Sequence, residues 1–165
     1  YYNIQERQRY DQVPFSLCKC SLQWIQSCLM DIQHEIIYHI VTASDFRKNV
    51  IGSMYVPESL LREGFIHCTF GKNTTLLVVE DFFSDVSETI YLLKIVTNAV
   101  IAPVRFEEPT SFSVGGKKHL EVETVFPHIY GSLNLDAVEG LGVIGRSWDR
   151  FLWPETFSAY LPDFY

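Results

Sequence analysis

Three histidines each lie within a short apolar run, where an imidazole needs partners for its ring nitrogens. They are His39 in the run 36–41, His67 in the run 65–68 and His128 in the run 126–130. β-Branched and aromatic residues dominate these runs, which is typical of buried strands. Imidazole gains and loses a proton near neutral pH, so it suits acid–base catalysis and ligand binding. We predict that the three histidines meet in one cleft as catalytic residues.

Cys68 follows His67, but the two cannot form a nucleophile–base pair within one strand. Alternate residues of a strand point to opposite faces. His67 shares a face with Phe65 and Thr69, whereas Cys68 shares the other face with Ile66. We therefore expect Cys68 to be a buried, unreactive thiol.

Two further residues on predicted strands could contact a ligand beside the histidines. Arg105 and Glu107 share one face of the strand 104–107, where a surface ion pair would contribute little. If that face lines the cleft, the planar guanidinium of Arg105 would bind an anion. Tyr130 shares a face with His128 and could stack on a flat ring.

The elements that must position these residues form one α+β domain. Apolar runs predict strands over 36–41, 65–68, 89–96, 104–107, 119–123, 126–130 and 140–144. Gly115 and Gly116 predict a hairpin turn. Short helices are expected after the cap at 42–45, after Pro57, and over 73–83 with a cap at Asn73 or Thr74.

The two ends of the chain differ in composition from this domain. Apolar residues at 22, 25, 29 and 32 have the spacing of an amphipathic helix. The C-terminal segment is rich in aromatic residues and is expected to fold over the surface. We therefore divide the chain into an N-terminal extension (1–35), a histidine-containing domain (36–144) and an aromatic tail (145–165). The helix and the tail are candidate surfaces for a protein partner.

Composition excludes several classes of function. The chain has 165 residues, is 47% hydrophobic, and is long enough for one core. A net charge of -7 without a Lys/Arg cluster argues against general nucleic-acid binding. Polar residues interrupt the apolar stretch 13–32, so we expect no membrane-spanning helix. Four cysteines without disulfide or zinc-site spacing favour a cytoplasmic protein.

The histidine runs occur together with other motifs in the order of a known bacterial family. The matching pieces are Ile37-Tyr38-His39-Ile40, Pro57-Glu58-Ser59-Leu60, Glu63-Gly64-Phe65-Ile66-His67-Cys68-Thr69, Ala102-Pro103-Val104-Arg105-Phe106-Glu107 and Phe126-Pro127-His128-Ile129-Tyr130-Gly131-Ser132-Leu133. Together they resemble the bacterial domain-of-unknown-function family 952, over about residues 36–144. That family in turn resembles the ADP-ribosyltransferase fold, in which small split β-sheets surround a dinucleotide cleft.

The resemblance implies NAD or another phosphorylated nucleotide as the ligand. In the broader fold, a histidine on the first strand and a following Ser or Thr contact the ribose, and His39 and Thr42 resemble that element. A second strand begins after glycine and ends in Ser or Thr, as from Gly64 to Thr69. His128 lies where the third strand usually supplies a catalytic glutamate.

Four functions stay open on the sequence, which does not decide whether the chain is an enzyme. The first is an ADP-ribosyl or 2′-phosphate transferase, with His39 on the ribose, His67 and Arg105 on the phosphate, and His128 as acid or base. RNA 2′-phosphotransferases also lack the glutamate, and they resemble this pocket more than protein-modifying enzymes do. The second is a nucleotide- or metabolite-binding module without turnover. The third is a three-histidine metal site with an open fourth position, and the fourth is a pure interaction module.

Overall fold

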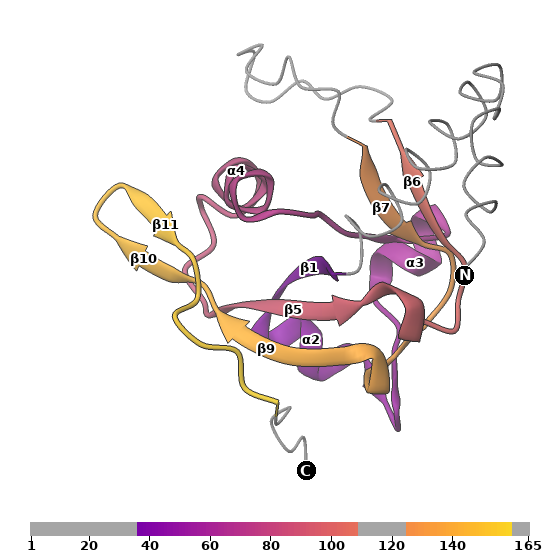
Figure 1. Ribbon diagram of the computed structural model, residues 1–165. Helices are drawn as coiled ribbons and strands as arrows, with labels where there is room; N and C mark the ends of the chain where they lie inside the picture. Colours follow the sequence, from indigo (N-terminus) through magenta and orange to yellow (C-terminus); the bar gives the residue numbers. More distant parts are fainter. Residues whose placement is uncertain (1–35, 109–124, 160–165) are drawn as a thin grey trace, which may run out of the picture. The chain divides into compact units, whose positions relative to one another are not determined.

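The computed structural model describes residues 36–108 and 125–159 of the chain (Figure 1). The predicted helix around 22–32, the turn at 115–116 and the strand 119–123 lie outside these residues. The described part is a small α+β unit with several antiparallel sheets and short helices, as predicted. No helix within it is long and apolar enough to cross a lipid bilayer.

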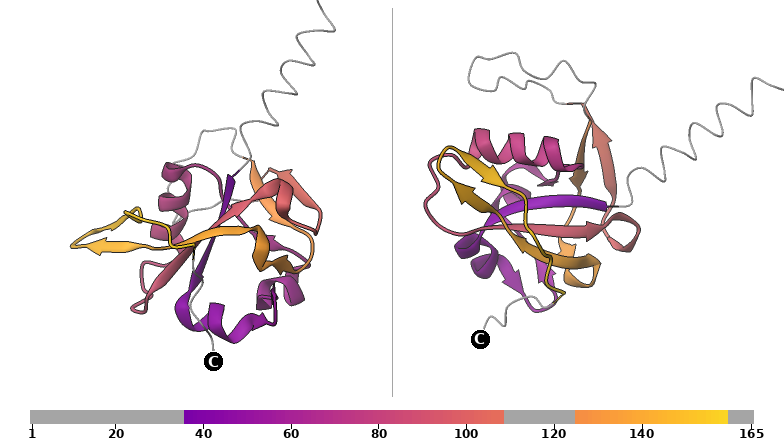
Figure 2. Two further views of the ribbon diagram at one scale, coloured as in Figure 1. Left: turned by 60° about the horizontal axis from the view of Figure 1, so that its bottom comes forward. Right: turned by 60° about the vertical axis from the view of Figure 1, so that its left-hand side comes forward.

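The central sheet, drawn in two further views in Figure 2, has a hydrophobic core on each side. Its strands are β1 (Ile36–Thr42), β5 (Ile90–Val96) and β9 (Val138–Val143), in the order β1-β5-β9. Leu93 and Ile95 face the larger core. Leu92 faces a smaller core that includes Val79 of α4 (Lys72–Phe82). The side chains of β5 therefore alternate between two cores, one on each side of the sheet.

A second sheet carries two of the three histidines. Its strands are β4 (Ile66–His67), β7 (Phe126–Ile129) and β6 (Val104–Glu107), in the order β4-β7-β6. Two hydrogen bonds connect it to β1: the Tyr38 N–H donates to the Thr69 carbonyl, and the Thr69 N–H donates to the Tyr38 carbonyl, each at 2.8 Å. This bridge brings His39 beside the backbone of His67.

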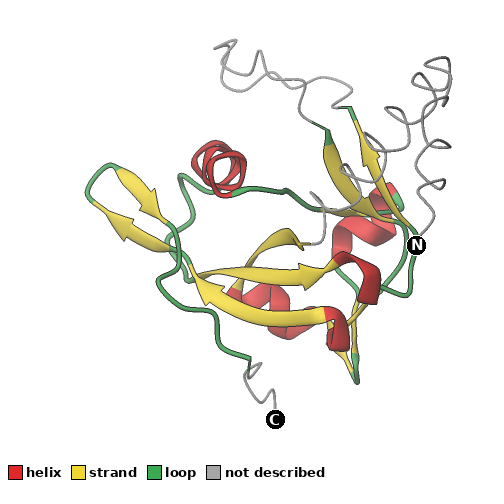
Figure 3. Cartoon of the chain, in the orientation of Figure 1, coloured by secondary structure: helices red, strands yellow, loops and turns green. Residues whose placement is uncertain are grey.

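Several short elements were not predicted (Figure 3). They are β2 (Val50–Ile51), β3 (Met54–Tyr55), β8 (Leu133–Asn134), β10 (Gly145–Ser147), β11 (Arg150–Leu152) and the 3-10 turns η1 (Thr97–Ala99) and η2 (Leu135–Ala137). Segments of two or three residues are too short to show a hydrophobic period, so sequence patterning misses them.

Two helices close to the histidines begin or end as expected. In α2 (Ala43–Asn49), the Thr42 hydroxyl accepts from the Asp45 N–H at 3.2 Å, the predicted cap. In α3 (Glu58–Glu63), Pro57 is the capping residue, whereas we expected it at the first helical position, so the helix begins one residue later than predicted. Gly64 ends this helix with a φ of 86°, a conformation that favours glycine.

The predicted side-chain cap of α4 is wrong. The helix begins at Lys72 after Gly71, and no side chain caps it. Asn73 and Thr74 already lie within the first turn, so neither can occupy the capping position. The strand expected at 65–68 is also shorter, because only Ile66 and His67 keep ladder pairing.

The aromatic tail packs on the central sheet through Trp153 and Phe157. Their ring centroids lie 5.0 and 6.2 Å from that of Tyr38. Pro154 lies so close to β9 that a Cβ built at Gly142 would lie 2.7 Å from its ring. Glycine is therefore needed there for the tail to approach. The domain limits at 35 and 144 stay predictions.

Candidate functional site

One face of the β4-β7-β6 sheet gathers most of the predicted site residues. In this antiparallel sheet His67 is paired with His128, and His128 is paired with Arg105. Directly paired residues share a face, so these three side chains form a row across the sheet. We call them the nitrogen row. Ile66 and Ile129 point the other way and are fully buried in the core.

Aromatic rings lie beside the nitrogen row. The centroids of the His67 and His128 rings are 5.3 Å apart, with their planes at 87°. The Phe65 ring lies 4.7 Å from His67, 4.3 Å from His128 and 5.5 Å from Tyr130. The Arg105 guanidinium lies over the Tyr130 ring, 4.7 Å from its centroid. Phe65 therefore contacts both imidazoles and links them to Tyr130.

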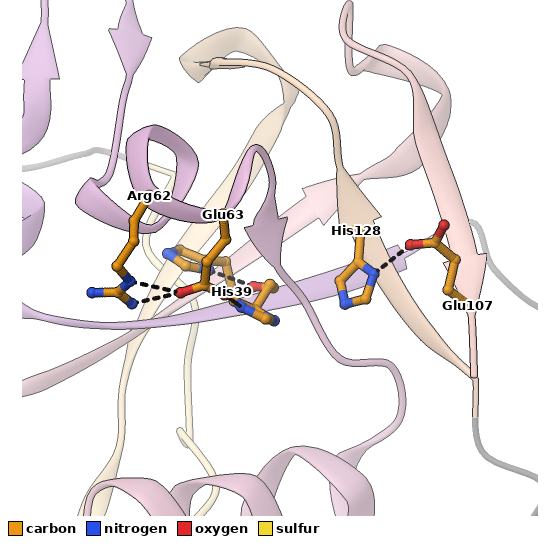
Figure 4. A network of polar contacts seen from close by, with 6 residues as sticks. His39, Arg62, Glu63, Glu107 and His128 are labelled. Atoms are coloured by element: carbon orange, nitrogen blue, oxygen red, sulfur yellow. Dashed lines mark hydrogen bonds and ion pairs between the residues drawn. The ribbon is translucent and has the colours of Figure 1, made fainter. Parts of the chain in front are cut away.

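Each imidazole of the row is held by a carboxylate, and Figure 4 shows the pair His128 and Glu107. His67 Nε2 lies 2.6 Å from Glu63 Oε2, and His128 Nδ1 lies 2.7 Å from Glu107 Oε2. The Tyr130 hydroxyl donates to the same oxygen of Glu107 at 2.7 Å. An ionised carboxylate only accepts, so the facing nitrogen carries the proton.

These bonds keep both carboxylates charged and leave one nitrogen of each ring available. The hydrogen bond from His67, and then that from Arg62, lowers the pKa of Glu63. The bonds from His128 and then Tyr130 lower the pKa of Glu107. Within residues 36–108 and 125–159, nothing hydrogen-bonds Nδ1 of His67 or Nε2 of His128. In a neutral ring each of these nitrogens carries a lone pair.

His39 lies in a different environment. Its Nδ1 is 2.7 Å from the His67 carbonyl, and its Nε2 is 3.1 Å from the Tyr55 hydroxyl. A carbonyl only accepts, so Nδ1 carries the proton and the Tyr55 O–H donates to Nε2. Burial lowers the pKa of His39 to about 4 and raises the pKa of Tyr55. His39 is thus neutral at pH 7, with both nitrogens bonded inside the protein.

The two predicted threonines also bond within the protein. Thr42 caps α2. The Thr69 hydroxyl lies 2.7 Å from the Thr75 hydroxyl and 3.4 Å from the Tyr38 carbonyl. Thr42 and Thr69 both border the cleft, and their roles toward a ligand stay predictions.

The three histidines border one open cleft of about 1020 Å³. His67 is well exposed in it, with 54% of its side chain accessible, whereas His128 keeps 13%. Cys68 is buried as expected, and burial raises the pKa of its thiol. No ion pair between Arg105 and Glu107 forms in the described part of the chain, because Glu107 binds His128 instead.

Sequence reasoning missed two residues of this site, Glu63 and Tyr55. Glu63 precedes His67 by four residues, but the break at Gly64 hides any helical or strand relationship between them. Tyr55 lies on a two-residue strand that has no recognisable pattern. Neither position carries a signal that spacing alone could have revealed.

The described residues give little support to a three-histidine metal site. No group of three His, Cys, Asp or Glu side chains among residues 36–108 and 125–159 could hold a metal ion. The reason is geometric, because both nitrogens of His39 already have partners and the free nitrogens of the other two rings number only two.

Comparison with known proteins assigns the chain to a family. The profile of the family described as protein of unknown function (DUF952) matches residues 40–141. This match covers more than half of the chain, and the chain belongs to that family. No curated protein matches.

Solved structures agree with the fold. Two crystal structures of protein CC0527 from Caulobacter crescentus, one of them a double mutant, are similar to this chain. Each shares 16% sequence identity at a TM-score of 0.54, covering 70% of this chain and 90% of that chain. Such a likeness shows the fold alone. The relation to ADP-ribosyltransferases stays a prediction.

Proposed function

We propose that the cleft binds a phosphorylated nucleotide and that the protein is a transferase of its ribosyl or phosphoryl group. The nitrogen row His67–His128–Arg105, beside the rings of Phe65 and Tyr130, is the observation that carries this proposal. NAD, which the family resemblance implies, is one ligand of this class.

The nitrogen row suits a phosphate. A guanidinium presents a planar set of donors to an anion, and an imidazole adds a further donor when it is protonated. The two imidazoles border the cleft, whereas Arg105 does not; its guanidinium lies over the ring of Tyr130, which does border it. The long Arg105 side chain could therefore reach a phosphate that the two imidazoles bind. The aromatic pair Phe65 and Tyr130 offers a flat apolar surface for a base or nicotinamide ring.

The two carboxylate–imidazole pairs suit proton transfer. When His67 takes a proton on Nδ1, or His128 on Nε2, the carboxylate on the opposite side of that ring stabilises the resulting cation. One ring can therefore accept a proton from the attacking group while the other donates to the leaving group. We assign the acid–base roles to these two residues.

His39 is assigned a positioning role in this proposal. Its Nδ1–H bond to the His67 carbonyl fixes the backbone from which that imidazole projects. Its occupied nitrogens also favour a second candidate function, a binding module without turnover. The two functions share the ligand and differ only in chemistry.

Isothermal titration calorimetry on the full chain tests the proposal. NAD and the four ribonucleoside 5′-monophosphates would be titrated into the wild-type protein, His67→Ala and His128→Ala. We expect each alanine variant to weaken binding by about tenfold or more, because it loses a hydrogen bond to the charged phosphate. Lys94→Ala, whose residue pairs with Glu139 outside the cleft, should bind as the wild type does.

The outcomes separate the two candidates and can refute both. Release of nicotinamide or phosphate that depends on His67 and His128 would support a transferase. Saturable binding without release would support the binding module. Absence of binding to the folded wild-type protein, or equal binding by both histidine variants, would refute the nucleotide site.

A further inference from the structure

We infer that the cleft selects a ligand with one phosphate monoester over a pyrophosphate, because a carboxylate lies beside each imidazole of the nitrogen row. This inference rests on the proposed nucleotide site and narrows its ligand class. The selectivity disfavours a dinucleotide such as NAD. It favours a nucleoside monophosphate or the end of a polynucleotide that carries one phosphate.

The residues that line the cleft carry an excess of negative charge. They include five carboxylates, Asp45, Glu58, Glu63, Glu107 and Glu108. The one guanidinium among them belongs to Arg62, because Arg105 lies beyond the lining of the cleft. The guanidinium is already neutralised, because Arg62 Nη2 lies 2.5 Å from Glu63 Oε1. Asp45 and Glu108 have no ion-pair partner in the part of the chain that the structure describes.

The carboxylates lie on both sides of the nitrogen row. At one side Glu63, the last residue of α3, binds His67. At the other side Glu107 of β6 binds His128, and Glu108 comes directly after it. A single phosphate can lie on the two imidazoles between these carboxylates. A second phosphate joined to it would meet a carboxylate in either direction, and like charges at short range oppose binding.

The helix N-termini at the cleft do not compensate. Proteins often bind a pyrophosphate with the free backbone N–H groups at a helix N-terminus. Here the cleft borders the starts of α2 and α3, but each carries its own acidic residue in the first turn, Asp45 and Glu58. The longer helix α4 borders the cleft only through Val78, Phe82 and the residue after its end, Phe83. No residue from the first turn of α4 borders the cleft.

Calorimetry with matched nucleotides tests this selectivity on the full chain. AMP, GMP, CMP and UMP would each be compared with the diphosphate of the same base, and adenosine 2′-monophosphate and NAD would be added. We expect the best monophosphate to bind about tenfold or more tightly than its diphosphate and than NAD. Comparison within one base removes the contribution of the ring.

A double variant tests the physical reason. Asp45→Asn/Glu108→Gln removes two exposed carboxylates from the cleft and should reduce the preference for monophosphate about threefold or more. Glu139→Gln removes a carboxylate that does not border the cleft, so it should leave the preference unchanged. Circular dichroism would confirm that both variants fold.

Each outcome bears on a distinct claim. A diphosphate or NAD that binds as tightly as the monophosphate would overturn the selectivity and leave the nucleotide site standing. An unchanged preference in the double variant would overturn the carboxylate explanation, and with it the inference. Binding of no nucleotide by the folded protein would overturn both the inference and the proposed function.

Discussion

His67 and His128 are directly paired across the ladder between β4 and β7, with ring centroids 5.3 Å apart and planes at 87°. Residues 61 positions apart in the chain thus lie side by side on one face of the sheet. Glu63 holds the first ring through Nε2 and Glu107 holds the second through Nδ1. The two rings consequently expose different nitrogens to the cleft.

The hydrogen bonds define opposite tautomers for the two rings. When neutral, His67 should carry its proton on Nε2 and His128 on Nδ1, because each carboxylate can only accept. Long-range proton–nitrogen NMR correlations of the ring nitrogens at alkaline pH would measure this. Glu107→Ala should abolish the preference of His128 and leave His67 unchanged. The same tautomer in both wild-type rings would contradict the structure.

Acid should destabilise the fold through His39. Its folded pKa of about 4 lies below the usual 6.5, so the unfolded state binds a proton in this window that the folded state excludes. Stability must therefore fall as the pH is lowered from 6.5 toward 4, by about 2 kcal/mol between pH 7 and pH 5. Urea unfolding at several pH values would measure the slope.

A glutamine at position 39 provides the control for this pH dependence. His39→Gln can donate to the His67 carbonyl and accept from the Tyr55 hydroxyl but does not titrate. The variant should show a flatter profile above pH 5. Glu63 and Glu107 have a lowered pKa, so their contribution is lost only as the pH falls below the usual 4.5. An equally steep slope in His39→Gln would rule out His39 as the cause.

Loss of the Tyr55 hydroxyl should cost more than loss of the Tyr130 hydroxyl. Tyr55→Phe leaves Nε2 of His39 buried without a donor, a cost of about 1–3 kcal/mol in the free energy of unfolding. Tyr130→Phe removes a bond to Glu107, which keeps His128 as a partner, so its cost should stay below about 0.5 kcal/mol. Chemical denaturation of both variants checks the order, and equal costs would be inconsistent with it.

Phe65 should matter more for binding than for folding. Its ring contacts His67, His128 and Tyr130. Phe65→Ala removes these contacts and should weaken nucleotide binding about tenfold, while the half-buried position limits the loss of stability to about 1–2 kcal/mol. Phe65→Tyr keeps the ring and should keep the affinity. Calorimetry would measure the nucleotide affinity of both variants. An unaltered affinity in Phe65→Ala would argue against the aromatic subsite.

Any side chain at Gly142 should displace the aromatic tail. A Cβ there would lie 2.7 Å from Pro154, so Gly142→Ala should destabilise the protein by about 1–3 kcal/mol and alter Trp153 fluorescence. The neighbouring Val143 is 51% exposed. Val143→Ala therefore serves as a control with a small effect. Wild-type fluorescence in Gly142→Ala would mean that the tail does not need this close approach.

The sequence predicted the longer elements because they repeat a pattern over enough residues. The strands β1, β5 and β6 and the cap of α2 by Thr42 agree with prediction. The predicted cap of α4 was wrong because Asn73 and Thr74, although good capping residues, lie two and three residues after the capping residue Gly71. Two-residue strands such as β3 carry no period and could not be predicted.

The convergence of the histidines on one cleft was predicted from their shared surroundings, but their individual environments were not. A strand pattern shows that His67 and Cys68 face apart, and the structure agrees. It does not show which strands lie next to one another. Glu63 and Tyr55 became partners of His67 and His39 only through that arrangement.

The sequence alone was enough to predict the α+β class, the opposite orientations of His67 and Cys68, and the residue types available for chemistry. The three-dimensional structure was needed to show that His67 and His128 each keep one unbonded ring nitrogen, whereas both nitrogens of His39 are bonded. The reason is that strand neighbours and register depend on packing between distant segments. The β4-β7-β6 order puts Arg105 beside His128, and the bridge between Tyr38 and Thr69 puts His39 against the main chain of His67.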